Sequence, residues 1–122
     1  AIDYLESIGW KEITGREEVL TAKLLAGMKQ IPGVHILGSG DEKEHCGIVS
    51  FTVDDVHPHD IASILDEAHV AVRAGHHCAQ PLLEWLGISS CARASVAFYN
   101  TSEDIGRFLD QLAQVRRMMG YE

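Results

Sequence analysis

Helix-type and strand-type hydrophobic patterns alternate along the whole chain, and this alternation restricts the fold more than any other feature. Residues 14–31 carry apolar side chains at helical period and stop at Pro32-Gly33, whereas residues 47–53 form a β-branched and aromatic run. The sequence contains no internal repeat and no low-complexity linker. We therefore expect one α+β domain over residues 1–122, with helices packed on one face of a small mixed β-sheet.

The same patterns place the remaining elements. Capping-box spacing at Thr14 with Glu17, and again at Thr101 with Asp104, predicts two helix starts, and Pro58 suits the first position of another helix. The expected helices are 2–8, 14–31, 58–68, 81–86 and 101–119, and the expected strands are 34–37, 47–53, 70–73 and 92–98.

Charge and hydropathy exclude several function classes. The 122 residues include 10 Lys+Arg against 18 Asp+Glu, so the net charge of −8 offers no basic stripe for a nucleic-acid partner. No apolar run approaches the roughly 18 residues that span a bilayer, and no basic-then-apolar leader opens the chain. We expect a cytoplasmic protein with neither nucleic acid nor membrane as a partner.

The three cysteines, Cys46, Cys78 and Cys91, are odd in number and widely spaced. Small secreted domains usually use an even set, so this pattern does not predict a disulfide framework. The thiols are then either inert core residues or part of the chemistry. Cys46 opens an apolar strand and Cys91 lies just before one, so a structural role is favoured for both.

The densest chemical cluster is the run from Arg73 to Cys78. A predicted strand ends at Arg73, the chain turns at Gly75, and His76 and His77 precede the thiol. Neighbouring cations raise the thiolate fraction, and the thiolate is the nucleophilic form of cysteine. The alternative, that Cys78 is a small buried apolar residue, is equally weighted on thiol chemistry alone.

Arg93 stands in an alternating, largely apolar strand. Burying a guanidinium is costly unless it meets an anion, and its planar fork suits a carboxylate. The alternative is a strand-edge arginine whose head reaches solvent.

A zinc site is the competing interpretation of the histidines and cysteines. Structural zinc ligands usually come in short pairs such as Cys-x₂-Cys, and no such pair is present, so we expect no metal site. The His57-Pro58-His59-Asp60 segment is typical of a polar helix start.

Two motifs carry a family resemblance. Residues 73–81, Arg-Ala-Gly-His-His-Cys-Ala-Gln-Pro, and residues 92–101, Ala-Arg-Ala-Ser-Val-Ala-Phe-Tyr-Asn-Thr, resemble the active-site motifs of group II cysteine desulfurases, the SUF-type and selenocysteine-lyase-like branch. The opening residues 1–5 and the 57–60 segment also fit this family.

The resemblance implies a function for each motif residue. Family members are pyridoxal-phosphate (PLP) enzymes of fold type I that take sulfur from L-cysteine or selenium from selenocysteine. They release L-alanine and hold the sulfur as a cysteine persulfide for iron–sulfur cluster assembly or other sulfur-transfer pathways. By resemblance Cys78 carries the persulfide, Arg93 pairs with the substrate carboxylate, and Arg73 borders the same site. His76 and His77 shape the active-site loop.

The resemblance also implies what lies outside this sequence. The family holds PLP through a lysine in a Ser-x-His-Lys motif of a larger domain, and Lys11, Lys23, Lys29 and Lys43 have no such context. The chain therefore corresponds to the C-terminal small domain, and alone it is expected neither to bind PLP nor to turn over cysteine. Full-length family members are homodimers.

Relatives of this branch pass sulfur to a scaffold-like acceptor protein, and His59 occupies the position that engages the acceptor in some of them. Two other interpretations stay open: a cofactor-free module that docks such an acceptor, and an α+β domain whose cysteines are only structural. Faster alkylation of Cys78 than of Cys46 and Cys91 is the expectation that separates the first interpretation from the last.

Overall fold

The computed structural model describes residues 1–121. In chain order the elements are α1 (Ile2–Ile8), α2 (Trp10–Met28), β1 (Val34–Ile36), the 3₁₀ turn η1 (Glu42–Glu44), β2 (Ile48–Val53), α3 (Pro58–Glu67), β3 (Arg73–Gly75), α4 (Gln80–Trp85), β4 (Cys91–Ser95), α5 (Ser102–Leu112) and α6 (Val115–Met118).

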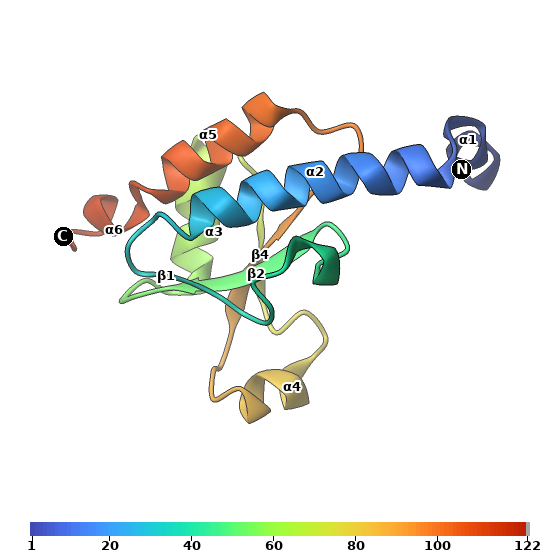
Figure 1. Cartoon of the computed structure of the whole chain (residues 1–122). Coiled ribbons are helices and arrows are strands. Elements are labelled where there is room, and N and C mark those ends of the chain that lie inside the picture. Colours follow the sequence, from blue (N-terminus) through green and yellow to red (C-terminus); the bar gives the residue numbers. More distant parts are fainter. Residues whose placement is uncertain (122) are drawn as a thin grey trace.

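The four strands form one sheet in the order β1-β2-β4-β3. All three pairings are antiparallel, where the sequence predicted a small mixed sheet. The α+β class, with α2, α3 and α5 packed over one face, is confirmed, and Figure 1 shows α2 and α5 side by side above the sheet.

The two faces of the sheet differ in chemistry. Val49, Phe51, Ala92 and Ala94 point into the core, where they meet buried residues of the three covering helices, including Leu24, Met28, Ile61, Leu65 and Phe108. Because side chains alternate along a strand, Arg93 and its neighbours two positions away lie on the opposite face. That second face carries the polar residues of the sheet.

Of the two helix starts predicted from capping-box spacing, one is correct and one is wrong, and the start predicted at Pro58 is correct. Thr101 and Asp104 form the capping box of α5 with bonds in both directions. The start at Thr14 is wrong, because α2 begins at Trp10, directly after Gly9 with its φ of 96°. Thr14 lies inside the helix, and its hydroxyl donates to the Trp10 carbonyl at 2.9 Å.

Several other boundaries differ from the prediction. The helix expected to residue 31 ends at Met28, and the strand expected over 92–98 ends at Ser95, after which the Ala97 N–H donates to the Asn100 side chain and not to a strand. The strand expected over residues 70–73 begins only at Arg73, because the Val70 N–H donates to the Leu65 carbonyl and so completes the end of α3. The long helix expected to Met119 divides into α5 and α6. At the break the Gln114 N–H donates to the Gln111 carbonyl, three residues earlier, where a continuous α-helix would use the carbonyl four residues earlier.

The N-terminal arm contributes little to the core. Helix α1 buries none of its residues and lies at the far end of α2, beyond the sheet (Figure 1). Among residues 1–121, no helix combines the length and the apolar character needed to cross a membrane.

Candidate active site

The β3–β4 pairing places two arginines directly opposite each other. Arg73 is the register partner of Arg93, and on the other side of β4 Arg93 is paired with Ser50 of β2. Residues paired across a ladder have their side chains on the same face. Both guanidinium groups therefore belong to the face of the sheet that α2, α3 and α5 leave uncovered.

These two charges have no carboxylate partner within residues 1–121. The ion pairs formed in this part of the chain join His35 with Asp54 and Arg116 with Asp55. Arg93 is half-buried, and its Nε–H is shielded from solvent without an acceptor among the described residues. A guanidinium in this state is prepared to bind an anion that the described chain does not supply.

Cys78 stands on a tight turn that follows β3. The turn spans residues 76–79 and is closed by a 2.9 Å bond from the Ala79 N–H to the His76 carbonyl. Its two central residues, His77 and Cys78, have φ of 56° and 58°, as in a type I′ turn. Non-glycine residues in this region cost on the order of 1–3 kcal/mol each. The thiol of Cys78 is exposed.

His77 ties this turn to the sheet, whereas His76 is exposed. The His77 Nε2 lies 3.1 Å from the Cys91 carbonyl, so the ring donates there. Burial lowers the pKa of His77, and the charges of Arg93 and Arg73 lower it further against the opposing effect of that hydrogen bond. The imidazole is therefore biased toward its neutral form.

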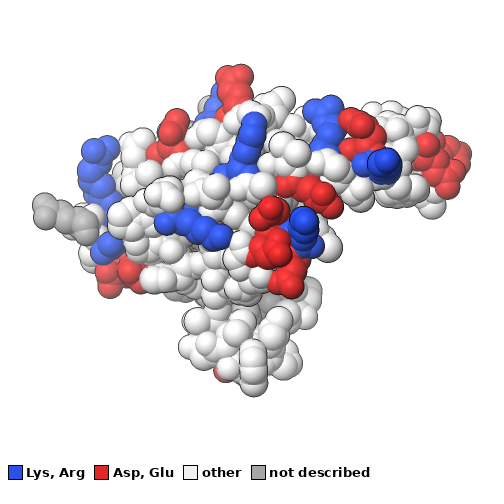
Figure 2. All heavy atoms as spheres, in the orientation of Figure 1, with Lys and Arg blue, Asp and Glu red and all other residues white. Residues whose placement is uncertain are grey.

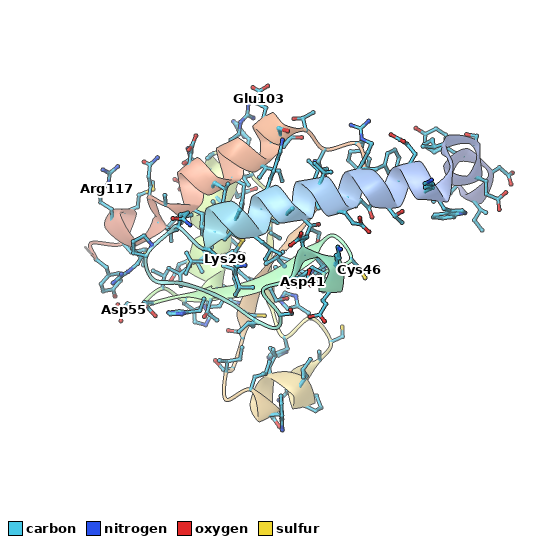
Figure 3. The ribbon with its side chains drawn as sticks, viewed as in Figure 1. Lys29, Asp41, Cys46, Asp55, Glu103 and Arg117 are labelled. Atoms are coloured by element: carbon cyan, nitrogen blue, oxygen red, sulfur yellow. The ribbon has the colours of Figure 1, made fainter. Side chains whose placement is uncertain are left out.

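The other two thiols lie in contrasting environments. Cys91 is buried, as expected; burial raises the pKa of its thiol, partly offset by a hydrogen bond from Ser50. A structural role was favoured for Cys46, but its side chain is not buried. Cys46 is exposed on the loop between η1 and β2 (Figure 3). The strand begins only at Ile48, so Cys46 precedes the part that packs.

The α4 lobe beside the turn is apolar. Leu83 anchors α4, while Trp85 is 82% exposed and Leu82 is 54% exposed. In the view of Figure 2 charged side chains gather over α2, α5 and the η1 region, and the α4 lobe below them is almost entirely uncharged. The thiol on the turn is thus flanked by surface suited to contact with another protein part.

His59 lies apart from the arginines, at the start of α3. Its ring stacks on His57 with centroids 5.3 Å apart, and the His57 Nδ1 caps the helix by accepting from the His59 N–H. His57 also lines a groove of about 420 Å³ with residues 87–90, the segment that connects α4 to β4. The groove links the start of α3 to the α4 lobe.

Residues 1–121 contain no group of three or more His, Cys, Asp or Glu side chains arranged to hold a metal ion. The lysines do not fit a cofactor-binding role at this face either. Lys23 of α2 donates to the Ser102 hydroxyl, and Lys29, directly after α2, donates to the Gly40 carbonyl. Both hydrogen bonds hold these lysines on the helix-covered side of the sheet, away from the arginine-bearing face.

Comparison with known proteins identifies the family. The model of the aminotransferase class-V family matches residues 1–108, and the chain belongs to this family. Within it the similarity is to cysteine desulfurases, which confirms the resemblance seen in the sequence. A probable cysteine desulfurase from Staphylococcus aureus (strain Mu50 / ATCC 700699) is 47% identical over all 122 residues. The chain spans 29% of the length of that relative.

Solved structures agree with this assignment. The apo cysteine desulfurase from Thermococcus onnurineus NA1 superposes with a TM-score of 0.91 at 38% identity, covering 96% of this chain and 29% of that one. The cystine C-S lyase C-DES, in complex with its product cysteine persulfide, gives a TM-score of 0.65 at 28% identity over 84% of this chain and 24% of that one. A mutant of C-DES carries glycine covalently linked to the PLP cofactor. These enzyme relatives do not favour the interpretation of a cofactor-free binding module.

Sequence reasoning missed two elements of the site. Ser50 was assigned only to a strand, although its pairing with Arg93 places it on the arginine-bearing face. The left-handed turn was also missed, because His-Cys lacks the Asn-Gly chemistry by which such turns are recognised. One arginine in each of two short strands, Arg73 and Arg93, was the available signal for the face itself.

Proposed function

We propose that this chain is the C-terminal small domain of a PLP-dependent cysteine desulfurase and that Cys78 receives the sulfur. In the overall reaction the C–S bond of L-cysteine breaks and a new S–S bond forms at Cys78. The products are L-alanine and a Cys78 persulfide, so no external oxidant or reductant is required. The observation that carries the proposal is the exposed Cys78 thiol on a turn that continues directly from the strand bearing Arg73.

Arg93 is proposed to bind the carboxylate of the substrate. The unpartnered Nε–H and the half-buried position leave the guanidinium available for two parallel hydrogen bonds to a planar anion. Arg73, opposite Arg93 in the ladder, adds positive potential on the same face. Together the arginines orient an amino acid, whereas the turn brings a thiol toward its side chain.

PLP supplies the electron sink that makes the C–S bond of the substrate labile. None of the four lysines lies in the motif that holds it in the family, and Lys23 and Lys29 make their hydrogen bonds on the helix-covered side of the sheet. We therefore assign PLP binding to a large domain elsewhere in a longer protein, called here the full-length enzyme. By itself the chain is expected to be inactive.

The sulfur on Cys78 is proposed to pass to an acceptor protein. Two features support an acceptor contact near His59. The groove beside His57 is lined by residues 87–90, which follow α4, and the apolar α4 lobe directly follows the turn that carries Cys78. The full-length enzyme is proposed to be a homodimer. We place it in the cytoplasm, where thiols stay reduced.

The test follows sulfur in the full-length enzyme loaded with PLP. After incubation with L-cysteine, the peptide containing Cys78 is expected to gain the mass of one sulfur atom, and alanine is expected as the co-product. Cys78→Ser should abolish both, while Cys46→Ser should leave both unchanged. Persulfide on Cys46, or undiminished turnover in Cys78→Ser, contradicts the proposal.

A further inference from the structure

The ring of His77 makes the most specific contact of the thiol turn, and the chemistry above does not use it. We propose that His77 is a positioning residue, whose hydrogen bond to the Cys91 carbonyl holds the left-handed turn that presents the Cys78 thiol. This inference rests on the proposed function for the role of Cys78. The hydrogen bond from His77 to the Cys91 carbonyl, called the clamp below, lies within the 122-residue chain and can be tested there without the full-length enzyme.

The turn opposes the intrinsic preferences of its residues. His77 and Cys78 are consecutive and both have positive φ, in a turn closed from Ala79 to His76. Asn-Gly is the favoured pair at these two positions, because glycine pays no steric cost there. A His-Cys pair persists in this conformation only when its surroundings fix it. Something beyond local sequence must hold the turn.

His77 provides that hold. Within residues 1–121, its bond to Cys91 is the one side-chain hydrogen bond that joins residues 76–79 to another element. Cys91 is itself fixed, since it is buried and is the register partner of Gly75. The ring therefore connects the first central residue of the turn to a buried residue of β4. Figure 1 shows the β3–α4 segment on the side of the sheet away from α2.

The geometry also specifies the protonation of the ring. A carbonyl oxygen accepts only, so the His77 Nε2 must carry hydrogen. The Nδ1 is shielded from solvent and has no partner among the described residues. The lowered pKa of His77 agrees with a neutral ring in which Nδ1 is unprotonated. This tautomer can be observed directly.

Positioning matters because sulfur transfer needs the thiol at attack distance. A misplacement of about 1 Å can cost on the order of 10²-fold in rate. The arginines belong to β3 and β4 rather than to the turn, so loss of the clamp should leave substrate binding intact. A defect in kcat with an unchanged KM is the expected signature.

The experiment compares three variants. His77→Phe keeps a ring without a donor, and His77→Gly accepts the left-handed backbone without a ring. His69→Phe is the matched control, because His69 is an exposed histidine outside the turn whose φ of 59° is also positive. In the 122-residue chain, NMR reports the imidazole tautomer and the exchange rate of the Ala79 amide. In the full-length enzyme, kcat and KM are measured for L-cysteine.

We expect the Nε2–H tautomer at His77 in the unaltered chain. Exchange of the Ala79 amide should accelerate about tenfold or more in both His77 variants and stay unchanged in His69→Phe. The kcat of both should fall about tenfold or more, with KM within about twofold. Unchanged Ala79 exchange and kcat in His77→Phe and His77→Gly would overturn the inference, as would an Nδ1–H tautomer.

Two further outcomes keep the test decisive. If the His77 variants do not fold, the tautomer in the unaltered chain settles whether the bond to Cys91 exists in solution. If the full-length enzyme forms no persulfide on Cys78, the proposed function fails, while the tautomer and the Ala79 exchange still decide whether His77 clamps the turn.

Discussion

Arg73 and Arg93 lie directly opposite each other in the β3–β4 ladder, with their side chains on the same face of the sheet. Like charges at such a position repel, and cross-strand pairs differ by about 0.2–1 kcal/mol in their contribution to stability. An anionic group bound between the two guanidinium groups, such as the substrate carboxylate proposed above, would offset this repulsion.

The first prediction concerns this repulsion in the 122-residue chain. Arg73→Thr should raise the free energy of unfolding by a few tenths to about 1 kcal/mol, because it removes one of two facing charges. Urea denaturation at low ionic strength measures the change. The gain should shrink by about half or more in 1 M NaCl, where charges are screened within roughly 3 Å. A gain that is independent of salt would assign it to strand propensity instead.

The second prediction concerns Arg93 in the full-length enzyme. Arg93→Lys keeps the charge but removes the planar fork, so kcat/KM for L-cysteine should fall by roughly 10–100-fold, in line with about 1.5–3 kcal/mol for hydrogen bonds to charged groups. Steady-state kinetics measure the loss. Arg107→Lys, on the exposed surface of α5, is the matched control and should keep normal kinetics. Parental kinetics in Arg93→Lys would remove Arg93 from substrate binding.

The third prediction concerns the thiols of the folded chain. Cys46 and Cys78 are exposed and Cys91 is buried with a raised pKa, so iodoacetamide should label the first two at least roughly tenfold faster than Cys91. Mass spectrometry of digested protein measures each site. Cys91 should reach the rate of the others only after unfolding in urea. Rapid labelling of Cys91 in the native chain would contradict its burial.

The fourth prediction uses the pKa of His77, which lies below its ordinary value of 6.5 in the folded chain. Between the two values the unfolded chain binds more protons than the folded one, so stability rises with pH in that window and falls as the pH drops below about 6.5. Urea denaturation from pH 7.5 to 5 measures the slope. His77→Phe should show a shallower dependence, and identical slopes would count against a perturbed His77.

The fifth prediction compares two glycines of α2. A methyl group at Gly27 would overlap the Cδ atoms of Leu109, where α2 packs on α5, whereas a methyl group at Gly15 meets no atom within 4 Å. Gly27→Ala should lose about 1 kcal/mol, since overpacking outweighs the better helix propensity. Gly15→Ala should gain about 0.5–1 kcal/mol. Thermal denaturation of both variants measures the difference, and equal gains would mean that Leu109 moves aside freely.

Much of this fold was predictable because periodic patterns of apolar residues encode it. The capping box at Thr101, the proline start of α3 and the alternation around Arg93 all lead to the observed elements. The start of α2 was not predictable from Thr14 and Glu17, because a capping-box spacing also occurs inside helices. The actual boundary is Gly9, which has a positive φ and both ends α1 and begins α2.

The site was predictable in its residue types but not in its geometry. The run from Arg73 to Cys78 identified the chemistry, yet only strand register reveals that Arg73 faces Arg93. The conformation of the turn at His77 and Cys78 depends on a contact with the Cys91 carbonyl, 14 positions along the chain. Long-range contacts of this kind leave no trace in local propensity.

The excursion through residues 76–90 leaves the sheet at Gly75 and returns at Cys91, which are partners in the same ladder. Arg73 and Arg93 lie in the two strands and therefore outside residues 76–90. Because each doubling of a loop costs only about 0.6 kcal/mol in closure entropy, residues 76–90 can lengthen or shorten while the register that pairs Arg73 with Arg93 stays fixed. A change in the length of this segment would alter how far the Cys78 thiol extends from the sheet without moving the two arginines.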